Sequence, residues 1–450
     1  MAELIISVSG LRGIIGQNLT PEVAIRYATA FAAESPSGPL LVARDGRPTG
    51  RMLADAVRGA LCAVGRDVID AEIAATPTVG VLVRRYQAAG GIQISASHNP
   101  SEYNGMKLFG PLGSVLTAAA GQPVLSRFQN STPAWVAHHQ VGRLSLVDDG
   151  LTDHLALLQA IVAVQRIRAC AFPVVLDSNH GAGSLLGRRL LEFLGCHVTV
   201  LGGEPDGRFA HPPEPTMANL EGVASRIPAA GAAVGFCQDP DADRLALIDD
   251  RGAYIGEEYT LALCLDHVLR SRPGPIVTNC ATSRMAADLA AKYGVPYFRS
   301  AVGEANVVAE MQARGAVFGG EGNGGPIDPR VGFVRDSFVG MALVLDALAE
   351  RQIRLSDWVA QLPRYVIHKT TISLSRERIP DAIAALQRRF PEAAVDMQDG
   401  LRLDWPDRWA LFRASNTEPI VRLIVEAPTR VAAEQLAAEA AAPVAQASSL

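Results

Sequence analysis

The sequence has few cysteines, and none of them is paired at a short spacing. The 450 residues contain six cysteines, with no C-x-x-C pair and no histidine at zinc-finger spacing. This pattern argues against a disulfide-stabilised secreted domain and against a zinc-finger module. Scattered single cysteines instead predict reduced thiols in the core of a cytoplasmic protein, at Cys62, Cys170, Cys196, Cys237, Cys264 and Cys280.

Long apolar runs and an excess of positive charge are also missing. No uninterrupted apolar segment is long enough to span a bilayer, so we expect no membrane partner. The formal net charge is -5 and no basic stripe is present, so we expect no nucleic-acid partner. The first ten residues carry the acidic Glu3 and no basic stretch, so we expect no secretory signal and a cytoplasmic location.

What the chain does contain is typical of a large globular protein. Hydrophobic residues make up 48% and charged residues 19%, and the length alone favours about three domains. Strand and helix patterns alternate in the N-terminal third, which predicts a parallel sheet covered on both faces. The expected strands are 4–8, 40–43, 68–74 and 92–94, and the expected helices are 21–34, 49–64 and 78–88.

The same order of elements returns twice, and the C-terminal part then changes character. A weakly periodic connection is expected over 122–150, and further strand–helix units are expected over 174–236 and 257–318. A smaller α+β part follows, in which Pro443 should end the last helix. Its expected strands are 369–374, 401–404, 409–413 and 421–425, and its helices are 379–388 and 430–442.

The motif Ser95-Ala96-Ser97-His98-Asn99-Pro100 follows the predicted strand 92–94. Ligands bind beyond the carboxyl ends of strands in such sheets, and Ser97 offers a hydroxyl nucleophile there. In an extended segment His98 points away from Ser97, so it is better placed to serve a substrate than to act as a triad base. The alternative interpretation is an ordinary polar turn.

The motif Asp239-Pro240-Asp241-Ala242-Asp243-Arg244 follows an apolar, buried strand. Three carboxylates so close repel one another unless a cation lies between them. Ligation by oxygen alone favours Mg²⁺ over zinc, and Arg244 could bind a phosphate with its planar fork. The alternative, a solvated acidic turn, is less favoured because a buried strand leads into the loop.

Two further segments carry polar groups suited to a sugar phosphate. Arg413, Ser415, Asn416, Thr417 and Arg422 offer cations and neutral donors for a phosphate, with a polar strand corner as the alternative.

In the glycine-rich run 319–325, Glu321 and Asn323 offer acceptors for sugar hydroxyls, with a flexible turn as the alternative. Arg12 and Lys107 each place one cation beside glycines and are weak signals alone.

Taken together, these motifs resemble those of the α-D-phosphohexomutase family, which includes phosphoglucosamine mutase, phosphomannomutase and phosphoglucomutase. Four motifs agree in order, at 95–100, 239–244, 320–325 and 413–422, and the similarity spans essentially the whole chain. The resemblance implies a heart-shaped molecule with a central cleft, built from three similar mixed-sheet α/β domains and a smaller C-terminal α+β domain. We place these domains at 1–148, 149–250, 251–364 and 365–450.

The resemblance also implies a mechanism and assigns residues to it. A hexose 6-phosphate and a hexose 1-phosphate would interconvert through a phosphoserine at Ser97 and a hexose 1,6-bisphosphate intermediate. Mg²⁺ would be held by Ser97, Asp239, Asp241 and Asp243. Lys107, with help from Arg12 and His98, would serve proton transfer and charge neutralisation, and Arg244 would steady the phosphoserine. Glu321 and Asn323 would bind the sugar, and the phosphate that does not react would be held by Arg413, Ser415, Asn416, Thr417 and Arg422.

The chain departs from the family pattern at three positions. Many members have histidine at Gly325, serine at Asn323 and a basic residue at Ala305. The form of the glycine run is closer to an archaeal-type subgroup labelled phosphoglucosamine mutase, which we take as the first choice of activity. Phosphomannomutase or phosphoglucomutase activity is the alternative.

Two other functions come after these activities: a sugar-phosphate phosphatase and a sugar-phosphate-binding protein without catalysis. A pure binder would need neither Ser97 nor the acidic triplet. We expect a monomer or a homodimer.

Overall fold

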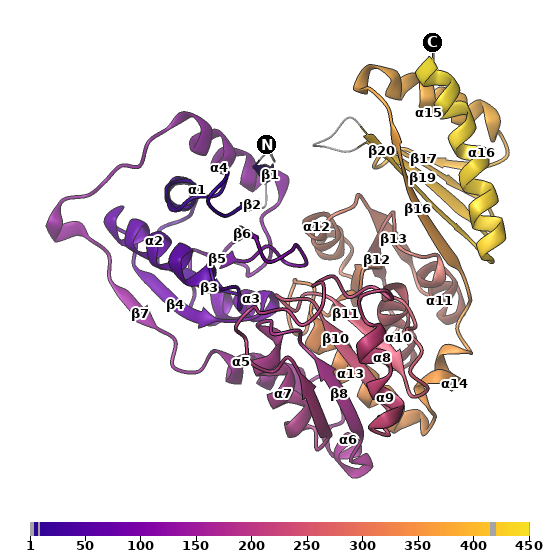
Figure 1. Cartoon of the computed structure of the whole chain (residues 1–450), viewed down its shortest axis with the longest axis horizontal. Coiled ribbons are helices and arrows are strands. Elements are labelled where there is room, and N and C mark those ends of the chain that lie inside the picture. Colours follow the sequence, from indigo (N-terminus) through magenta and orange to yellow (C-terminus); the bar gives the residue numbers. More distant parts are fainter. Residues whose placement is uncertain (1–3, 8–9, 415–419, 450) are drawn as a thin grey trace.

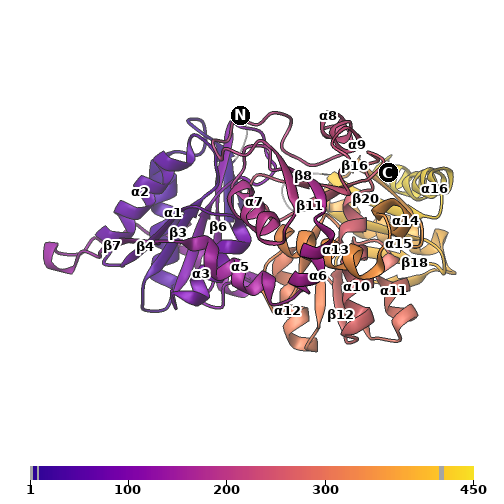
Figure 2. The same cartoon turned by 90° about the horizontal axis from the view of Figure 1, so that it is seen from below.

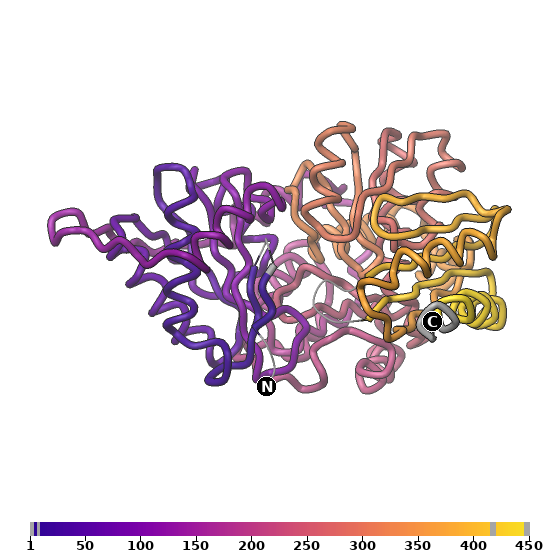
Figure 3. Tube along the Cα trace, turned by 90° about the horizontal axis from the view of Figure 1, so that it is seen from above, coloured from indigo at the N-terminus to yellow at the C-terminus, as the bar shows by residue number. Residues whose placement is uncertain are grey.

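The computed structural model describes residues 4–7, 10–414 and 420–449. Four separate sheets organise these residues in chain order, and we call the parts built on them domains I to IV (Figure 1). Domains I and IV lie at opposite ends of the molecule, and domains II and III lie between them (Figures 2 and 3). This is the predicted architecture of three α/β domains and one α+β domain.

Domain I contains a mixed sheet, not the parallel sheet that the alternating pattern predicts. Its strand order is β1-β2-β6-β5-β3-β4-β7, in which β3, β4, β5 and β7 are parallel and the other pairings are antiparallel. The connection from β5 to β6 is too short for a parallel crossover, which forces β6 to run back. The strands are β1 (Ile5–Ser7), β2 (Gly10–Ile14), β3 (Leu40–Arg44), β4 (Val68–Ile73), β5 (Gly90–Ile94), β6 (Tyr103–Phe109) and β7 (Leu144–Leu146).

The helices of domain I follow the prediction closely up to residue 90. Thr20 caps the first helix by accepting a hydrogen bond from the Val23 amide, and Pro21 opens it. The connection expected over 122–150 is in part helical, because Thr117 caps a further helix that buries Val124 and Phe128. The helices are α1 (Pro21–Glu34), α2 (Gly50–Ala63), α3 (Thr76–Arg85) and α4 (Ala118–Asn130), with a 3₁₀ turn at η1 (His138–Gln140).

Domains II and III repeat one pattern, in which three parallel strands are joined at one edge by an antiparallel strand. Domain II has β8 (Pro173–Asp177), β9 (His197–Leu201), β10 (Val234–Gln238), β11 (Leu245–Asp249), α5 (Gly150–Gln159), α6 (Val164–Cys170), α7 (Gly183–Phe193), α8 (Glu221–Ala224) and α9 (Arg226–Ala229). Domain III has β12 (Ile276–Asn279), β13 (Tyr297–Ser300), β14 (Phe318–Glu321), β15 (Gly325–Ile327), α10 (Glu257–Ser271), α11 (Met285–Tyr293), α12 (Glu304–Arg314), α13 (Ser337–Arg351) and α14 (Leu355–Val359).

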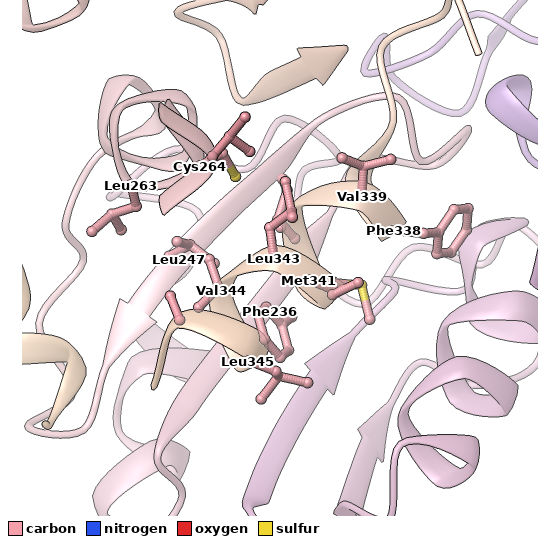
Figure 4. Close-up of a cluster of buried hydrophobic side chains, with 14 of the residues drawn as sticks. Phe236, Leu247, Leu263, Cys264, Phe338, Val339, Met341, Leu343, Val344 and Leu345 are labelled. Carbon is pink, nitrogen blue, oxygen red and sulfur yellow. The ribbon is translucent and has the colours of Figure 1, made fainter. Parts of the chain in front are cut away.

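Helix α13 is the central element of the largest core. All of its residues from Ser337 to Ala349 are buried, so it has no polar face that would show helical periodicity. Its side chains gather with Phe236 of β10 and Leu247 of β11 (Figure 4). This helix therefore joins domains II and III into one hydrophobic cluster and fixes the position of the loop that follows β10.

Domain IV is a five-stranded antiparallel sheet in the order β16-β20-β19-β18-β17. The prediction that Pro443 ends the last helix is wrong, because α16 continues to Ser449. Ala440 and Val444, on either side of Pro443, are both fully buried against the sheet, and this packing offsets the cost of an internal proline. The elements are β16 (Val366–Ser373), η2 (Arg376–Arg378), α15 (Ile379–Arg389), β17 (Ala394–Asp396), β18 (Leu401–Asp404), β19 (Trp409–Ala414), β20 (Ile420–Ala427) and α16 (Arg430–Ser449).

The six cysteines are all free thiols, and three of them are buried. Within the described part of the chain, no helix combines the length and the apolar character needed to cross a bilayer.

Candidate active site

A cavity of about 1030 Å³ opens between the domains and is lined by residues of all four. Eight of the side chains predicted from the sequence lie on its wall: Arg12, His98, Lys107, Arg244, Glu321, Asn323, Arg413 and Arg422. Ser97 lines a smaller neighbouring pocket of about 200 Å³, which shares Arg12 and Lys107 with the main cavity. Four motifs that are distant in sequence thus meet around one space.

The serine loop, residues 95–102, begins where β5 ends. Ser97 adopts a left-handed backbone with φ of 49° and is buried. A non-glycine residue in this region costs energy and persists only where its surroundings hold it. The Ser95 hydroxyl accepts a hydrogen bond from the Ser97 amide at 2.9 Å, and Ser95 in turn donates to Asp45 Oδ2 at 2.7 Å.

Arg47 is the main anchor of the serine loop, and the sequence motifs did not identify it. Its guanidinium is fully buried and pairs with Asp45 at 3.1 Å. It donates to four carbonyl oxygens of the loop and its end, at 2.5 to 2.9 Å: those of Ser97, Asn99, Pro100 and Tyr103. The signal that could have found it is the Asp45-Gly46-Arg47 run directly after a buried strand, the same criterion that drew attention to Asp239.

The acidic loop, residues 239–244, meets Ser97 directly. The Ser97 hydroxyl donates to Asp239 Oδ2 at 2.7 Å. Lys107 Nζ lies 3.2 Å from Asp241 Oδ2 and 2.7 Å from Asp243 Oδ2. The Thr76 hydroxyl also donates to Asp241 Oδ2, at 2.6 Å.

The acidic loop could hold a divalent cation. The three aspartates are fully buried, and one ligand oxygen from each lies within 4.8 Å of the others. Among the residues that the structure describes, Oδ1 of Asp241 and Oδ1 of Asp243 find no hydrogen-bond partner, which is costly for a buried carboxylate. A hard cation such as Mg²⁺ is the partner that such oxygens suit. The donor set therefore fits the metal expected from the sequence.

The pKa values of Asp239 and Asp243 in this loop are shifted in opposite directions. Burial, followed by repulsion from Asp241 and Asp243, raises the pKa of Asp239. Burial alone would also raise the pKa of Asp243, but Arg335 and Lys107 outweigh it and hold that pKa well below its usual range. The two aspartates beside Lys107 in turn outweigh burial and raise the pKa of its ammonium group.

His98 lies nearer to the serine than the prediction of an extended segment allows. Its Nδ1 is 3.3 Å from Ser97 Oγ, because the left-handed turn at Ser97 brings both side chains to the same side. Burial, then the charges of Arg244 and Arg12, lowers the pKa of His98 to about 3. The imidazole is therefore neutral near pH 7 and acts as a hydrogen-bonding group. In the same region, Arg12 donates a hydrogen bond to Asn99 Oδ1 at 3.3 Å.

The glycine-rich run forms a β-hairpin in place of a flexible turn, with Glu321 at the end of β14 opposite Gly325. Glu321 Oε1 accepts from Asn279 Nδ2 at 2.7 Å and from the Gly303 amide at 3.1 Å. Asn323 donates to Glu321 Oε2 at 3.4 Å, and its own Oδ1 is buried with no partner in the described part of the chain. Asn323 lines the cavity, and its buried Oδ1 would have to turn outward to accept from a sugar hydroxyl.

The segment predicted to bind phosphate is described only in part. Arg413 of β19 and Arg422 of β20 lie opposite each other in the sheet and both line the cavity. Arg413 Nε pairs with Asp399 at 2.7 Å. Lys369 of β16, which the sequence motifs did not include, adds a third cation to this wall. The predicted residues Ser415, Asn416 and Thr417 lie outside the described part of the chain.

Comparisons with known proteins identify the family. Models of the phosphoglucomutase/phosphomannomutase family match the chain in four parts: alpha/beta/alpha domain I at residues 4–134, domain II at 152–252, domain III at 257–365 and the C-terminal domain at 372–442. The chain belongs to the phosphoglucomutase/phosphomannomutase family. This confirms the predicted family and fold class, and the prediction that the protein is an enzyme of the phosphomutase class.

Individual relatives carry two different substrate names. A phosphoglucomutase/phosphomannomutase of Thermococcus kodakarensis is 36% identical over 95% of each chain. A probable phosphoglucosamine mutase of Methanopyrus kandleri is 32% identical over 95% of each chain. Among solved structures, a phosphoglucomutase/phosphomannomutase family protein of Burkholderia thailandensis superposes with a TM-score of 0.83 at 27% identity, over 98% of each chain.

Proposed function

We propose that this protein interconverts hexose 6-phosphates and hexose 1-phosphates through a phosphoserine at Ser97 and a hexose 1,6-bisphosphate. The observation that carries the proposal is the contact of 2.7 Å between Ser97 Oγ and Asp239 Oδ2 beside the shared cavity. A buried nucleophile next to three carboxylates has no purpose in a pure binding protein. It is the arrangement that phosphoryl transfer near a metal ion requires.

Ser97, Asp239, Asp241 and Asp243 would hold Mg²⁺, which would neutralise the charge of the phosphoryl group being transferred. The chain's own cations add to this effect in a site shielded from water, where such interactions are strong. Arg12 and Arg244 line the cavity on the side of the serine. Lys107, 15% exposed, is placed to exchange a proton with the sugar hydroxyl that accepts or releases the group.

The far side of the cavity would hold the sugar and the phosphate that does not react. Glu321 and Asn323 would bind sugar hydroxyls. Arg413 and Arg422, together with Ser415, Asn416 and Thr417, would bind the second phosphate. Because the bisphosphate must turn over between the two transfers, neutral donors at this end suit both orientations better than a tightly shaped pocket.

For the substrate we retain glucosamine phosphate, with mannose or glucose phosphate as the alternative. Besides Glu321, four carboxyl groups line the cavity: Glu214, Glu257, Glu258 and Glu304. Seven arginine and lysine side chains line the same cavity, so the charge of the whole wall does not select an amino sugar. A direct contact between one of these carboxylates and the ammonium group at C2 would do so. Glu258 lies so close to the hairpin that a Cβ at Gly322 would collide with its carboxylate.

A panel of sugar phosphates tests the activity and the substrate together. Each 1-phosphate and 6-phosphate of glucosamine, mannose and glucose is incubated with Mg²⁺ and a trace of the matching bisphosphate, and isomerised sugar and free phosphate are measured separately. We expect isomerised sugar without stoichiometric phosphate, and the highest kcat/KM for glucosamine phosphate. Free phosphate as the main product would instead identify a phosphatase.

Substitution of Ser97 tests the nucleophile. Ser97→Ala removes the hydroxyl that accepts the phosphoryl group, so we expect turnover to fall by about 10⁴-fold or more. The matched control is Ser101→Ala, an exposed residue of the same loop. Thermal unfolding should show both variants folded. Near wild-type turnover by Ser97→Ala would show that the nucleophile lies elsewhere.

We further propose the domain boundaries at 148, 250 and 364 given above. A monomer or homodimer in the cytoplasm also stays a prediction.

A further inference from the structure

Arg335 occupies the space that Gly325 leaves open. It lies between β15 and α13, with only 8% of its surface exposed. A Cβ at Gly325 would lie 2.4 Å from Arg335 Cδ and 2.8 Å from its Cγ. No side chain fits at 325 while Arg335 keeps this position. The absence of a side chain at 325 is thus matched by a buried arginine from another part of the chain.

The guanidinium of Arg335 connects two parts of the active site. Its Nη2 lies 2.6 Å from Asp243 Oδ2 in the acidic loop, and its Nη1 lies 2.9 Å from Glu321 Oε2 in the hairpin. Its Nε lies 3.4 Å from Glu304 Oε2, and its backbone amide donates to Glu304 Oε1 at 2.8 Å. Asp243 belongs to domain II, and the other two carboxylates belong to domain III.

We propose that Arg335 is a positioning residue that couples the metal-binding loop to the sugar-binding hairpin, and that Gly325 is required to admit it. A planar fork can hold two carboxylates at fixed positions, which a lysine ammonium cannot do. Arg335 holds Glu321 in place beside the sugar and at the same time shares Asp243 with the cation. The part of this proposal that concerns sugar binding rests on the proposed function. The part that concerns the cation rests only on the contact between Arg335 and the acidic loop.

Two substitutions separate the charge of Arg335 from its fork. Arg335→Met removes both, so we expect KM for the sugar phosphate to rise about tenfold or more. We also expect Mn²⁺, titrated by electron paramagnetic resonance without substrate, to bind at least about threefold more tightly, because a positive charge has left Asp243. Arg335→Lys keeps the charge, so Mn²⁺ affinity should stay at the wild-type value while KM remains raised.

Gly325→Ala tests the steric half of the proposal without changing any charge. Its methyl group should displace Arg335 and raise KM as Arg335→Met does, and Gly325→Ala with Arg335→Met should be no worse than Arg335→Met alone. Gly59→Ala is the control, because a Cβ at this position in α2 meets nothing within 4 Å. It should leave KM unchanged.

A purely structural role for Arg335 predicts a different result. Both Arg335 variants would then lower the melting temperature while KM and Mn²⁺ affinity stayed within twofold of wild type, and this outcome would overturn the proposal. Additive effects of Gly325→Ala and Arg335→Met would overturn the steric link. If the wild-type protein isomerises no sugar phosphate, the proposed function fails, but the Mn²⁺ titration still tests the contact between Arg335 and Asp243.

Discussion

The position of Ser97 depends on residues that are not themselves reactive. Arg47 holds four carbonyl oxygens around the serine and is neutralised by Asp45. The hydrogen bonds from this buried guanidinium fix the backbone of the serine loop and so keep the left-handed turn at Ser97 in place. Ser97, the proposed nucleophile, can then stay at hydrogen-bond distance from Asp239 although they are 142 positions apart in the chain.

Arg47→Lys should therefore impair catalysis more than a conservative change suggests. Lysine retains the charge beside Asp45 but cannot bond the four carbonyl oxygens in one plane. We expect kcat to fall about 100-fold through misplacement of Ser97. Steady-state kinetics measure this effect, with the exposed Arg51→Lys of α2 as control. A wild-type kcat for Arg47→Lys would contradict the anchoring role.

At this scale the sequence identifies the reactive groups better than their supports. Ser97 and the three aspartates follow buried strands, and their local spacing already indicates their chemistry. Arg335 lies 92 positions from Asp243, and Arg47 lies 50 positions from Ser97. The partners of Arg335 come together only after folding, so no local pattern marks it. The Asp45-Gly46-Arg47 run does mark Arg47 as a charged pair after a buried strand, but not its contacts with the distant serine loop. The side chain of His98 was misplaced for a related reason, since the turn at Ser97 depends on these distant supports.

Elements with a clear start signal or a short apolar run between turns could be predicted. Helix α1 begins after the cap Thr20 and Pro21, and strand β5 is a short buried run, and both agree with expectation. Helix α13 is buried on all sides and was missed, as were β6 and β11, whose antiparallel return follows from short loops. Helix α16 passes Pro443 because tertiary packing outweighs local propensity.

Asp266 of α10 ties the helices of domain III together. Its carboxylate contacts Lys292 of α11 at 2.7 Å, Arg351 of α13 at 2.7 Å and Trp358 of α14 at 2.9 Å. Burial alone would raise its pKa, but these partners, with Tyr293, outweigh burial and lower the pKa to about 2. The resulting stabilisation is complete above the unfolded value of about 4 and is lost as the pH falls towards 2.

Asp266→Asn should accordingly destabilise the protein by roughly 3 kcal/mol at pH 7. The difference in denaturation midpoint between wild type and variant should be the same at pH 7 and pH 5, and it should shrink at pH 3. The exposed Asp148→Asn provides the control and should show no such difference. A difference that is independent of pH down to 3 would mean that the carboxylate charge is not what holds these helices.

The whole molecule matters because no single domain contains a complete site. The proposed nucleophile comes from domain I and the acidic loop from domain II. The hairpin proposed to bind the sugar comes from domain III, and the arginines proposed to bind the second phosphate come from domain IV. The sequence supplied each motif and, by resemblance, their order around a cleft. It could not supply the link through Arg335, which depends on how domains II and III pack around α13.

The most direct test follows a labelled phosphoryl group onto the protein. The wild-type enzyme is mixed with a hexose 1,6-bisphosphate carrying ³²P, quenched within one turnover, digested and mapped. We expect the label on the peptide containing Ser97, and hexose monophosphate should remove it. Rapid sugar isomerisation with no label on Ser97, or with label on another residue, would contradict this expectation.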